Sequence, residues 1–184
     1  LEQRDREDVL VQFINQSCSV LVATDVAARG LDIQTLDAVI NVDISPNAET
    51  HIHRIGRTGR SEARGLALTL CSQAEKFRAE RIEKALDAPL DWQDLPTVKA
   101  NARNLQAPMK TICLRAGKKD KIRPGDLLGA LTKDIGLQAS QVGKINIYDF
   151  VSFVAIERKA ADDTITQLRQ RTIKGRQLQM RFME

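Results

Sequence analysis

The chain has 184 residues, of which 42% are hydrophobic and 28% charged, and its formal net charge is +4. This size and composition fit one or two folded domains and exclude a disordered or fibrous chain. No apolar run reaches the length of a membrane span, and no secretory signal opens the sequence. The three cysteines, Cys18, Cys71 and Cys113, are widely spaced and form no CxxC pair. This pattern argues against a zinc site or disulfide framework and predicts a cytoplasmic protein.

The net charge is divided unevenly between the two halves of the chain. Residues 1–94 carry 11 Lys and Arg against 16 Asp and Glu, a net charge of −5, and residues 95–184 carry 17 against 8, a net charge of +9. This division predicts two domains, the second facing a polyanion, although solubilising lysines are an alternative explanation. Because the first residue is Leu1 rather than Met, we expect the chain to be part of a longer protein.

The first half alternates between helical and strand patterns. Helices are expected over residues 5–16 and 74–86, which have spaced apolar positions. Short apolar runs typical of buried parallel strands occupy residues 19–24, 38–44 and 65–70. Strands alternating with helices predict an α/β sheet. Three strands are few for such a sheet, so we expect earlier strands to be missing.

The second half follows the order β-α-β-β-α-β, after a proline-containing stretch without periodicity that predicts a linker. The strands are expected at residues 109–117, 143–150, 151–158 and 175–182, and the helices at 123–136 and 160–171. That order predicts a four-stranded antiparallel sheet with two helices on one face.

The octapeptide HRIGRTGR, residues 53–60, holds three arginines and two glycines. Guanidinium groups stay charged and match the geometry of phosphate oxygens. If residues 53–58 are helical, Arg57 shares the face of His53 and Arg60 lies just beyond, so two arginines could converge on a nucleotide γ-phosphate. Taken alone, the octapeptide also fits a solvated basic helix end.

A second motif, ATDVAARGLDI at residues 23–33, follows a predicted strand, where α/β folds usually bind ligands. Together with HRIGRTGR it resembles motifs V and VI of the DEAD-box RNA helicases. His53 matters to this resemblance, because DEAH-type relatives usually have glutamine there. LEQRDR at the N-terminus resembles the glutamine/arginine motif of the family, and AVINVDISPN at residues 38–47 resembles the segment between motifs V and VI.

The resemblance implies a role for each matching residue. Arg57 and Arg60 would act on ATP as arginine fingers, and His53 would link the nucleotide state to the acidic motif of the other lobe. Gly30 and Asp32 would lie at the nucleotide ribose. Support on the RNA side would come from Gln3 and Arg6. Thr24, Asp25 and Arg29 would help hold the RNA backbone or the contact between lobes, and Arg54 would serve the contact between lobes.

Two motifs of this family are not found in the sequence. It holds neither a GxxxxGK[ST] loop nor an Asp-Glu-Ala-Asp sequence, and both belong to the first lobe. We therefore expect ATP and Mg²⁺ to be bound mainly by lobe 1, in cis in the complete protein, and we predict no metal site in this chain. The polypeptide alone is expected neither to hydrolyse ATP nor to unwind RNA.

Positive charge in the second half gathers in loops and predicts a grip on RNA phosphates, with solvated loops as the alternative. The residues are Lys118, Lys119, Lys121, Arg123, Lys144, Lys174 and Arg176. The order of elements resembles an RNA recognition motif, which usually stacks bases on aromatic residues of its sheet. This sequence departs from that pattern, because Cys113 stands where an aromatic is expected. Phe153 is left as either a stacking residue or a core residue.

A helicase lobe followed by such a domain, with GKKDKIRPGD after its first strand, resembles the DbpA group of bacterial DEAD-box proteins. The expected parts are a second RecA-like lobe, incomplete at its front, over residues 1–88, a linker over 89–108 and an RNA-binding domain over 109–184. The resemblance implies an enzyme that anchors to a hairpin near the peptidyl-transferase centre of large-subunit ribosomal RNA and remodels nearby RNA with ATP during ribosome assembly. We expect a monomer without membrane contact. A general RNA helicase with a non-specific basic tail and a non-catalytic RNA-binding scaffold are the alternatives.

Overall fold

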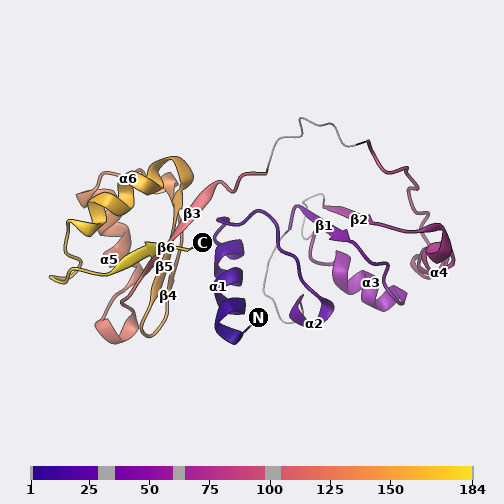
Figure 1. Ribbon diagram of the computed structural model, residues 1–184, viewed down its shortest axis with the longest axis horizontal. Coiled ribbons are helices and arrows are strands. Elements are labelled where there is room, and N and C mark those ends of the chain that lie inside the picture. Colours follow the sequence, from indigo (N-terminus) through magenta and orange to yellow (C-terminus); the bar gives the residue numbers. More distant parts are fainter. Residues whose placement is uncertain (1, 29–35, 60–64, 98–104, 184) are drawn as a thin grey trace. The chain divides into compact units, whose positions relative to one another are not determined.

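The computed structural model describes residues 2–28, 36–59, 65–97 and 105–183 (Figure 1). The chain divides into two compact units, one formed by residues 1–22 with 103–184 and the other by residues 23–102. One unit holds a two-stranded parallel sheet and the other a four-stranded antiparallel sheet, which confirms the predicted mixed α/β class. None of the helices over the described residues combines the length and apolar character that a membrane crossing requires.

The unit of residues 23–102 is built around the parallel sheet. Its elements are α2 (Asp25–Ala28), β1 (Ala38–Asn41), α3 (Ala48–Ile55), β2 (Leu66–Thr69), a 3-10 turn (Gln73–Glu75) and α4 (Lys76–Leu86). The strands pair in parallel, as predicted, with Asn41 opposite Thr69. The Asn41 amide Nδ2 donates to Thr69 Oγ1 at 3.1 Å, so the pair is joined through side chains as well as backbone.

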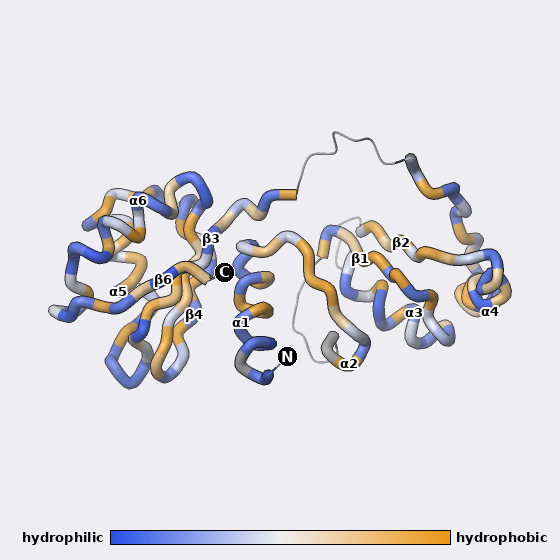
Figure 2. Tube along the Cα trace, viewed as in Figure 1, coloured by the Kyte–Doolittle hydropathy of each residue, from blue (hydrophilic) through white to orange (hydrophobic). Residues whose placement is uncertain are grey.

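The parallel strands are less buried than their apolar composition predicts. Ile40 is 61% exposed and Leu66 is 52% exposed. Residues 19–24, expected as a third strand, form none, and Val22 is 92% exposed. Figure 2 shows the strongly hydrophobic character of this segment between α1 and α2. A strand needs a neighbour for its backbone groups, and over the residues described here β1 and β2 have only each other as strand partners.

The four-stranded sheet carries the larger core. The elements of this unit are α1 (Gln3–Ile14), β3 (Met109–Leu114), a 3-10 turn (Lys118–Asp120), α5 (Pro124–Gly129), a π-helical turn (Ala130–Asp134), a 3-10 turn (Ala139–Gln141), β4 (Val142–Ile147), β5 (Ser152–Glu157), α6 (Arg158–Arg169) and β6 (Met180–Phe182). The strand order is β4-β5-β3-β6, with antiparallel pairing throughout. This is the predicted β-α-β-β-α-β arrangement, with a last strand shorter than expected.

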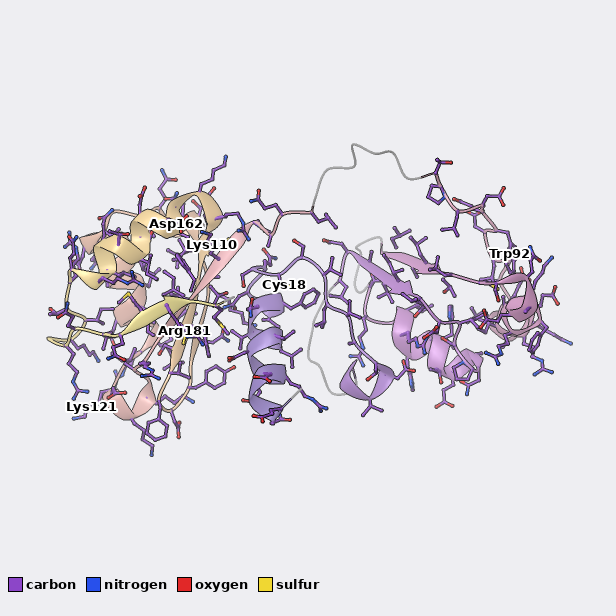
Figure 3. The ribbon with its side chains drawn as sticks, in the orientation of Figure 1. Cys18, Trp92, Lys110, Lys121, Asp162 and Arg181 are labelled. Atoms are coloured by element: carbon purple, nitrogen blue, oxygen red, sulfur yellow. The ribbon has the colours of Figure 1, made fainter. Side chains whose placement is uncertain are left out.

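One face of this sheet packs against α5 and α6. Ile112, Leu114, Val154 and Ile156 alternate along β3 and β5, and each is at most 1% exposed. Lys110 shares this face at the end of β3 and reaches α6, where its Nζ lies 2.7 Å from Asp162 Oδ1 (Figure 3). The alternation follows from the period of two along a strand and sets which residues lie on the opposite face.

The opposite face of the sheet lies under α1. Val11 of α1 is 7% exposed and packs with Cys113 and Phe153. Past the end of the helix, Asn15 Nδ2 donates to Thr111 Oγ1 at 3.3 Å, and the hydroxyls of Ser17 and Thr111 lie 2.7 Å apart. In this structure residues 1–22 therefore group with the four-stranded sheet.

Candidate functional site

The arginine-rich octapeptide spans the end of α3 and the turn after it. The helix ends at Ile55, and Gly56 caps it with its N–H 2.8 Å from the Ile52 carbonyl. The condition that residues 53–58 are helical is therefore not met, and Arg57 does not share a helical face with His53. Glycine at the cap, with its low helix propensity, accounts for the early end.

The turn that carries Arg57 is fixed through its backbone. The Leu36 N–H donates to the Arg57 carbonyl at 3.0 Å, and the Thr58 hydroxyl donates to the Leu36 carbonyl. Gly59 adopts a φ of 65°, and a Cβ on Gly65 would lie only 2.3 Å from the Gly59 nitrogen. These contacts hold the Arg57 backbone beside the parallel sheet, so its guanidinium extends from a defined position.

The remaining predicted site residues of the helicase-like motifs differ in how far the structure describes them. His53 is exposed in the last turn of α3, Arg57 is half-buried, and Thr24 is exposed just before α2. The predicted positions Arg29, Gly30, Asp32 and Arg60 lie outside the described residues. Among the described residues, no three His, Cys, Asp or Glu side chains gather as a metal site would require.

A bidentate ion pair joins the two helicase-like motifs. Arg54 Nε and Nη2 donate to the two carboxylate oxygens of Asp25, each at 2.7 Å, and Arg54 Nη1 donates to the Asp43 carbonyl at 2.7 Å. Hydrogen bonding to Asp25 raises the pKa of the Arg54 guanidinium above its ordinary value. In this structure the pair ties α2 to α3 within one unit, and its predicted part in RNA or interlobe contact stays a prediction.

A buried histidine lies one turn before Arg54. His51 is 8% exposed, and its Nδ1 has no hydrogen-bond partner among the described residues. Burial lowers the pKa of the His51 imidazole, and the nearby Arg54 charge lowers it further. The neutral form of the imidazole is therefore favoured. The sequence pattern gave no reason to expect a buried histidine at this position.

The predicted RNA-side residues of the N-terminus lie on α1. Gln3 and Arg6 are both exposed, and Gln3 Nε2 donates to Glu7 Oε1 at 3.1 Å within the helix. Because α1 covers the sheet, Phe153 beneath it is only 6% exposed. Phe153 is thus a packed residue in this structure, and the open face expected of an RNA recognition motif is covered.

The basic loops meet beside the N-terminus of α5. A hollow of about 350 Å³ is lined by Lys118, Lys121, Ile122, Arg123 and Lys174. Figure 3 labels Lys121 in this loop. Lys119 belongs to the same 3-10 turn as Lys118, whereas Lys144 lies in β4 and does not line the hollow. The sequence therefore predicted most of one cluster and one residue outside it.

Two carboxylates organise the basic cluster. Asp120 accepts from the Gly117 N–H at 3.1 Å and from Arg176 Nη1 at 2.9 Å. Asp126 accepts from the Arg123 N–H at 2.8 Å and lies 2.9 Å from Lys174 Nζ.

The contact with Lys174 holds the pKa of Asp126 below its ordinary value. Six cationic side chains thus lie with two carboxylates, leaving an excess of positive charge on loops that are held in place. The six are Lys118, Lys119, Lys121, Arg123, Lys174 and Arg176.

Comparison with known families divides the chain as its motifs do. Residues 1–62 match the family described as helicase conserved C-terminal domain, and residues 111–182 match the DbpA RNA binding domain. These two matches, in this order, support the C-terminal part of a DbpA-type DEAD-box RNA helicase. The resemblance drawn from HRIGRTGR and GKKDKIRPGD is thereby confirmed.

Relatives within the DbpA type align along nearly the whole chain. It is 46% identical over 184 residues to the ATP-dependent RNA helicase DbpA of Escherichia coli strain K12 and 32% identical over 199 residues to that of Bacillus subtilis strain 168. These alignments cover 100% and 97% of this chain but 40% and 42% of the relatives. A crystal structure of the E. coli DEAD-box protein SrmB bound to RraA matches 56% of this chain and 63% of that chain, at 30% identity and a TM-score of 0.49.

Proposed function

We propose that this chain is the RNA-anchoring, C-terminal part of an ATP-dependent RNA helicase that remodels large-subunit ribosomal RNA during ribosome assembly. The observation that carries the proposal is the order of two specific matches, a helicase C-terminal domain followed by a DbpA RNA-binding domain whose basic loops converge. The complete protein would act in the cytoplasm as a monomer, with lobe 1 in cis.

The lobe residues would supply half of an ATP site. Arg57 extends from a turn fixed by Leu36 and Thr58, which suits a guanidinium that must meet charge developing on a phosphoryl group. Arg60 would be the second arginine, and Gly30 and Asp32 would lie at the ribose. Mg²⁺ and most phosphate contacts would come from lobe 1, so this chain alone should not turn over ATP.

The basic cluster would grip the phosphates of an RNA hairpin. Its loops are held by backbone and side-chain bonds from Asp120 and Asp126, so the lysines start from ordered positions. Phosphate contacts position an RNA but do not read its sequence, so a preference for one hairpin requires further contacts. The alternative, a helicase with a non-specific basic tail, would make the same phosphate contacts without these further contacts.

Charge neutralisation tests this site directly. Replacing Lys118, Lys119 and Lys121 with Gln should weaken hairpin binding and flatten its dependence on salt, by about 0.7–0.9 in the log–log slope for each phosphate that is no longer neutralised. The measurement is fluorescence anisotropy of a labelled hairpin across a salt series. The matched control replaces the exposed residues Lys84, Lys133 and Lys159 with Gln, an equal change in net charge. Equal weakening in the two triple variants would contradict a site at the basic cluster.

A further inference from the structure

The tip of the β4–β5 hairpin carries two exposed aromatic side chains. Tyr148 is 47% exposed and Phe150 is 72% exposed. The turn is closed by the Tyr148 N–H, which donates to the Val151 carbonyl at 2.9 Å. Tyr148 and Phe150 lie two residues apart at one turn, so the tip offers adjoining aromatic surface to a ligand.

This tip is clamped to the basic turn that follows β3. The Lys118 N–H donates to the Tyr148 carbonyl at 2.8 Å, and the Lys119 N–H donates to the Asp149 carbonyl at 2.9 Å. Gly117 permits the approach, since a Cβ there would lie 2.2 Å from the Tyr148 oxygen. Two lysines and two aromatic residues are therefore carried by backbone segments that are bonded to each other.

The usual stacking surface of this fold is covered, and the exposed rings lie at its rim. Phe153 is buried beneath Val11, and Tyr148 meets it edge-on, with ring centroids 5.7 Å apart and planes at 78°. That contact supports one edge of the Tyr148 ring, while the rest of the side chain faces solvent. Within the described part of residues 105–183, Tyr148 and Phe150 are the aromatic residues exposed to solvent.

We propose that the hairpin tip, residues 148–150, stacks unpaired bases of the RNA whose phosphates lie in the basic cluster. Every base has a π face that an aromatic ring can cover, and lysines on the adjacent turn can neutralise the phosphates of the same strand. An apolar protein segment would also cover Phe150, but lysines fixed beside the tip favour a polyanion. The inference rests on the proposed RNA binding and adds contacts to bases, which phosphate binding lacks.

The test compares variants of Phe150 in the full chain, which the exposure of this side chain allows without disturbing the core. Phe150→Ala should weaken binding of a hairpin with an unpaired loop by roughly ten-fold, the usual effect of losing one stacked base, and should leave the salt slope unchanged. Phe150→Trp should restore binding. The matched control is Phe77→Ala, because Phe77 is 51% exposed and lies 5.7 Å from each of Arg78 and Arg81.

A direct readout uses Phe150→Trp combined with Trp92→Phe, which leaves one tryptophan at the tip. Stacking should quench its fluorescence when the looped hairpin is added, and a fully paired duplex should quench it far less. If the wild-type chain binds the hairpin but Phe150→Ala binds equally well and no quenching occurs, the inference is wrong while the proposed function stands. If the wild-type chain does not bind the hairpin, the proposed function itself fails.

Discussion

The two sheets of this chain differ in how far their own unit covers them. In the antiparallel sheet Ile112 and Val154 are fully buried, whereas in the parallel sheet Ile40 and Leu66 are more than half exposed. The antiparallel sheet has helices on both faces, and the parallel one pairs two short strands. Both sheets contain apolar strands, so the difference in burial depends on which helices and strands cover them.

The largest expected effect concerns the ATP site that this lobe would share with lobe 1. In the complete protein, Arg60→Lys should lower ATP turnover by about 10³-fold or more, because lysine cannot offer the planar fork of a guanidinium to the phosphoryl group. Steady-state phosphate release measures this change. Hairpin binding should stay as in the wild type, since it belongs to the other region. Near-normal turnover would remove Arg60 from the ATP site.

The next effect concerns the close approach of Gly117 to the backbone of Tyr148 in the RNA-binding domain. Gly117→Ala should destabilise the RNA-binding domain by about 2–3 kcal/mol, because the added Cβ would meet the Tyr148 and Asp149 backbone. The control is Gly125→Ala in helix α5, where an added Cβ meets nothing within 4 Å. The thermal unfolding midpoints of the two variants are compared. That control should be neutral or slightly stabilising. Equal midpoints for the two alanine variants would show that the close approach carries no strain.

A smaller effect concerns the ion pair inside the lobe. Asp25→Asn removes one charge of a bidentate pair that is partly solvent-exposed, so the variant should be less stable by about 1 kcal/mol or less. Trp92 is the single tryptophan and lies in this unit, 5.7 Å from Lys76 Nζ, so its fluorescence can follow urea unfolding. Asp94→Asn is the control, an equal change in charge at an exposed carboxylate of the same unit. A destabilisation equal to that of Asp94→Asn would mean that the pair contributes no net stability.

The smallest effect is a pH dependence confined to the lobe. Burial holds the pKa of His51 below its ordinary value of 6.5, so below that pH the unfolded chain binds more protons than the folded one. Stability of residues 23–102 should therefore fall as pH decreases from about 7.5 through 6.5, and His51→Leu should flatten the dependence. Urea midpoints read from Trp92 at several pH values measure it. An unchanged slope in His51→Leu would assign the titration to another group.

The sequence predicted the order of elements well and their surroundings less well. Alternation along β3 placed Ile112 and Leu114 on one face correctly, because the period of two is a local property. The burial of β1 and β2 was overestimated, because coverage depends on residues distant in sequence. The end of α3 at Ile55 was missed, although Gly56 was a usable signal.

Site residues could be predicted where they form a contiguous motif, but not where they depend on residues far apart in the sequence. The motifs around Arg57 and Lys118 are contiguous in sequence and could be recognised from it. The pairing of Arg54 with Asp25 joins residues 29 positions apart, and the clamp of Gly117 on Tyr148 depends on two loops meeting. The role of Asp120 and Asp126, which accept hydrogen bonds from the backbone of the basic loop, was not predicted from the sequence. Carboxylates three residues after a glycine or an arginine, at a turn, could have suggested that role.

The most direct measurement of RNA anchoring is anisotropy of this chain with a labelled peptidyl-transferase-centre hairpin, beside a stem of equal length with a scrambled loop, across a salt series. Phosphate contacts should weaken in parallel for both RNAs as salt rises, because they carry no sequence information. We predict tighter binding of the native loop that persists at high salt. Equal binding of both stems, disappearing together as salt rises, would contradict a specific anchor and leave only an electrostatic tether.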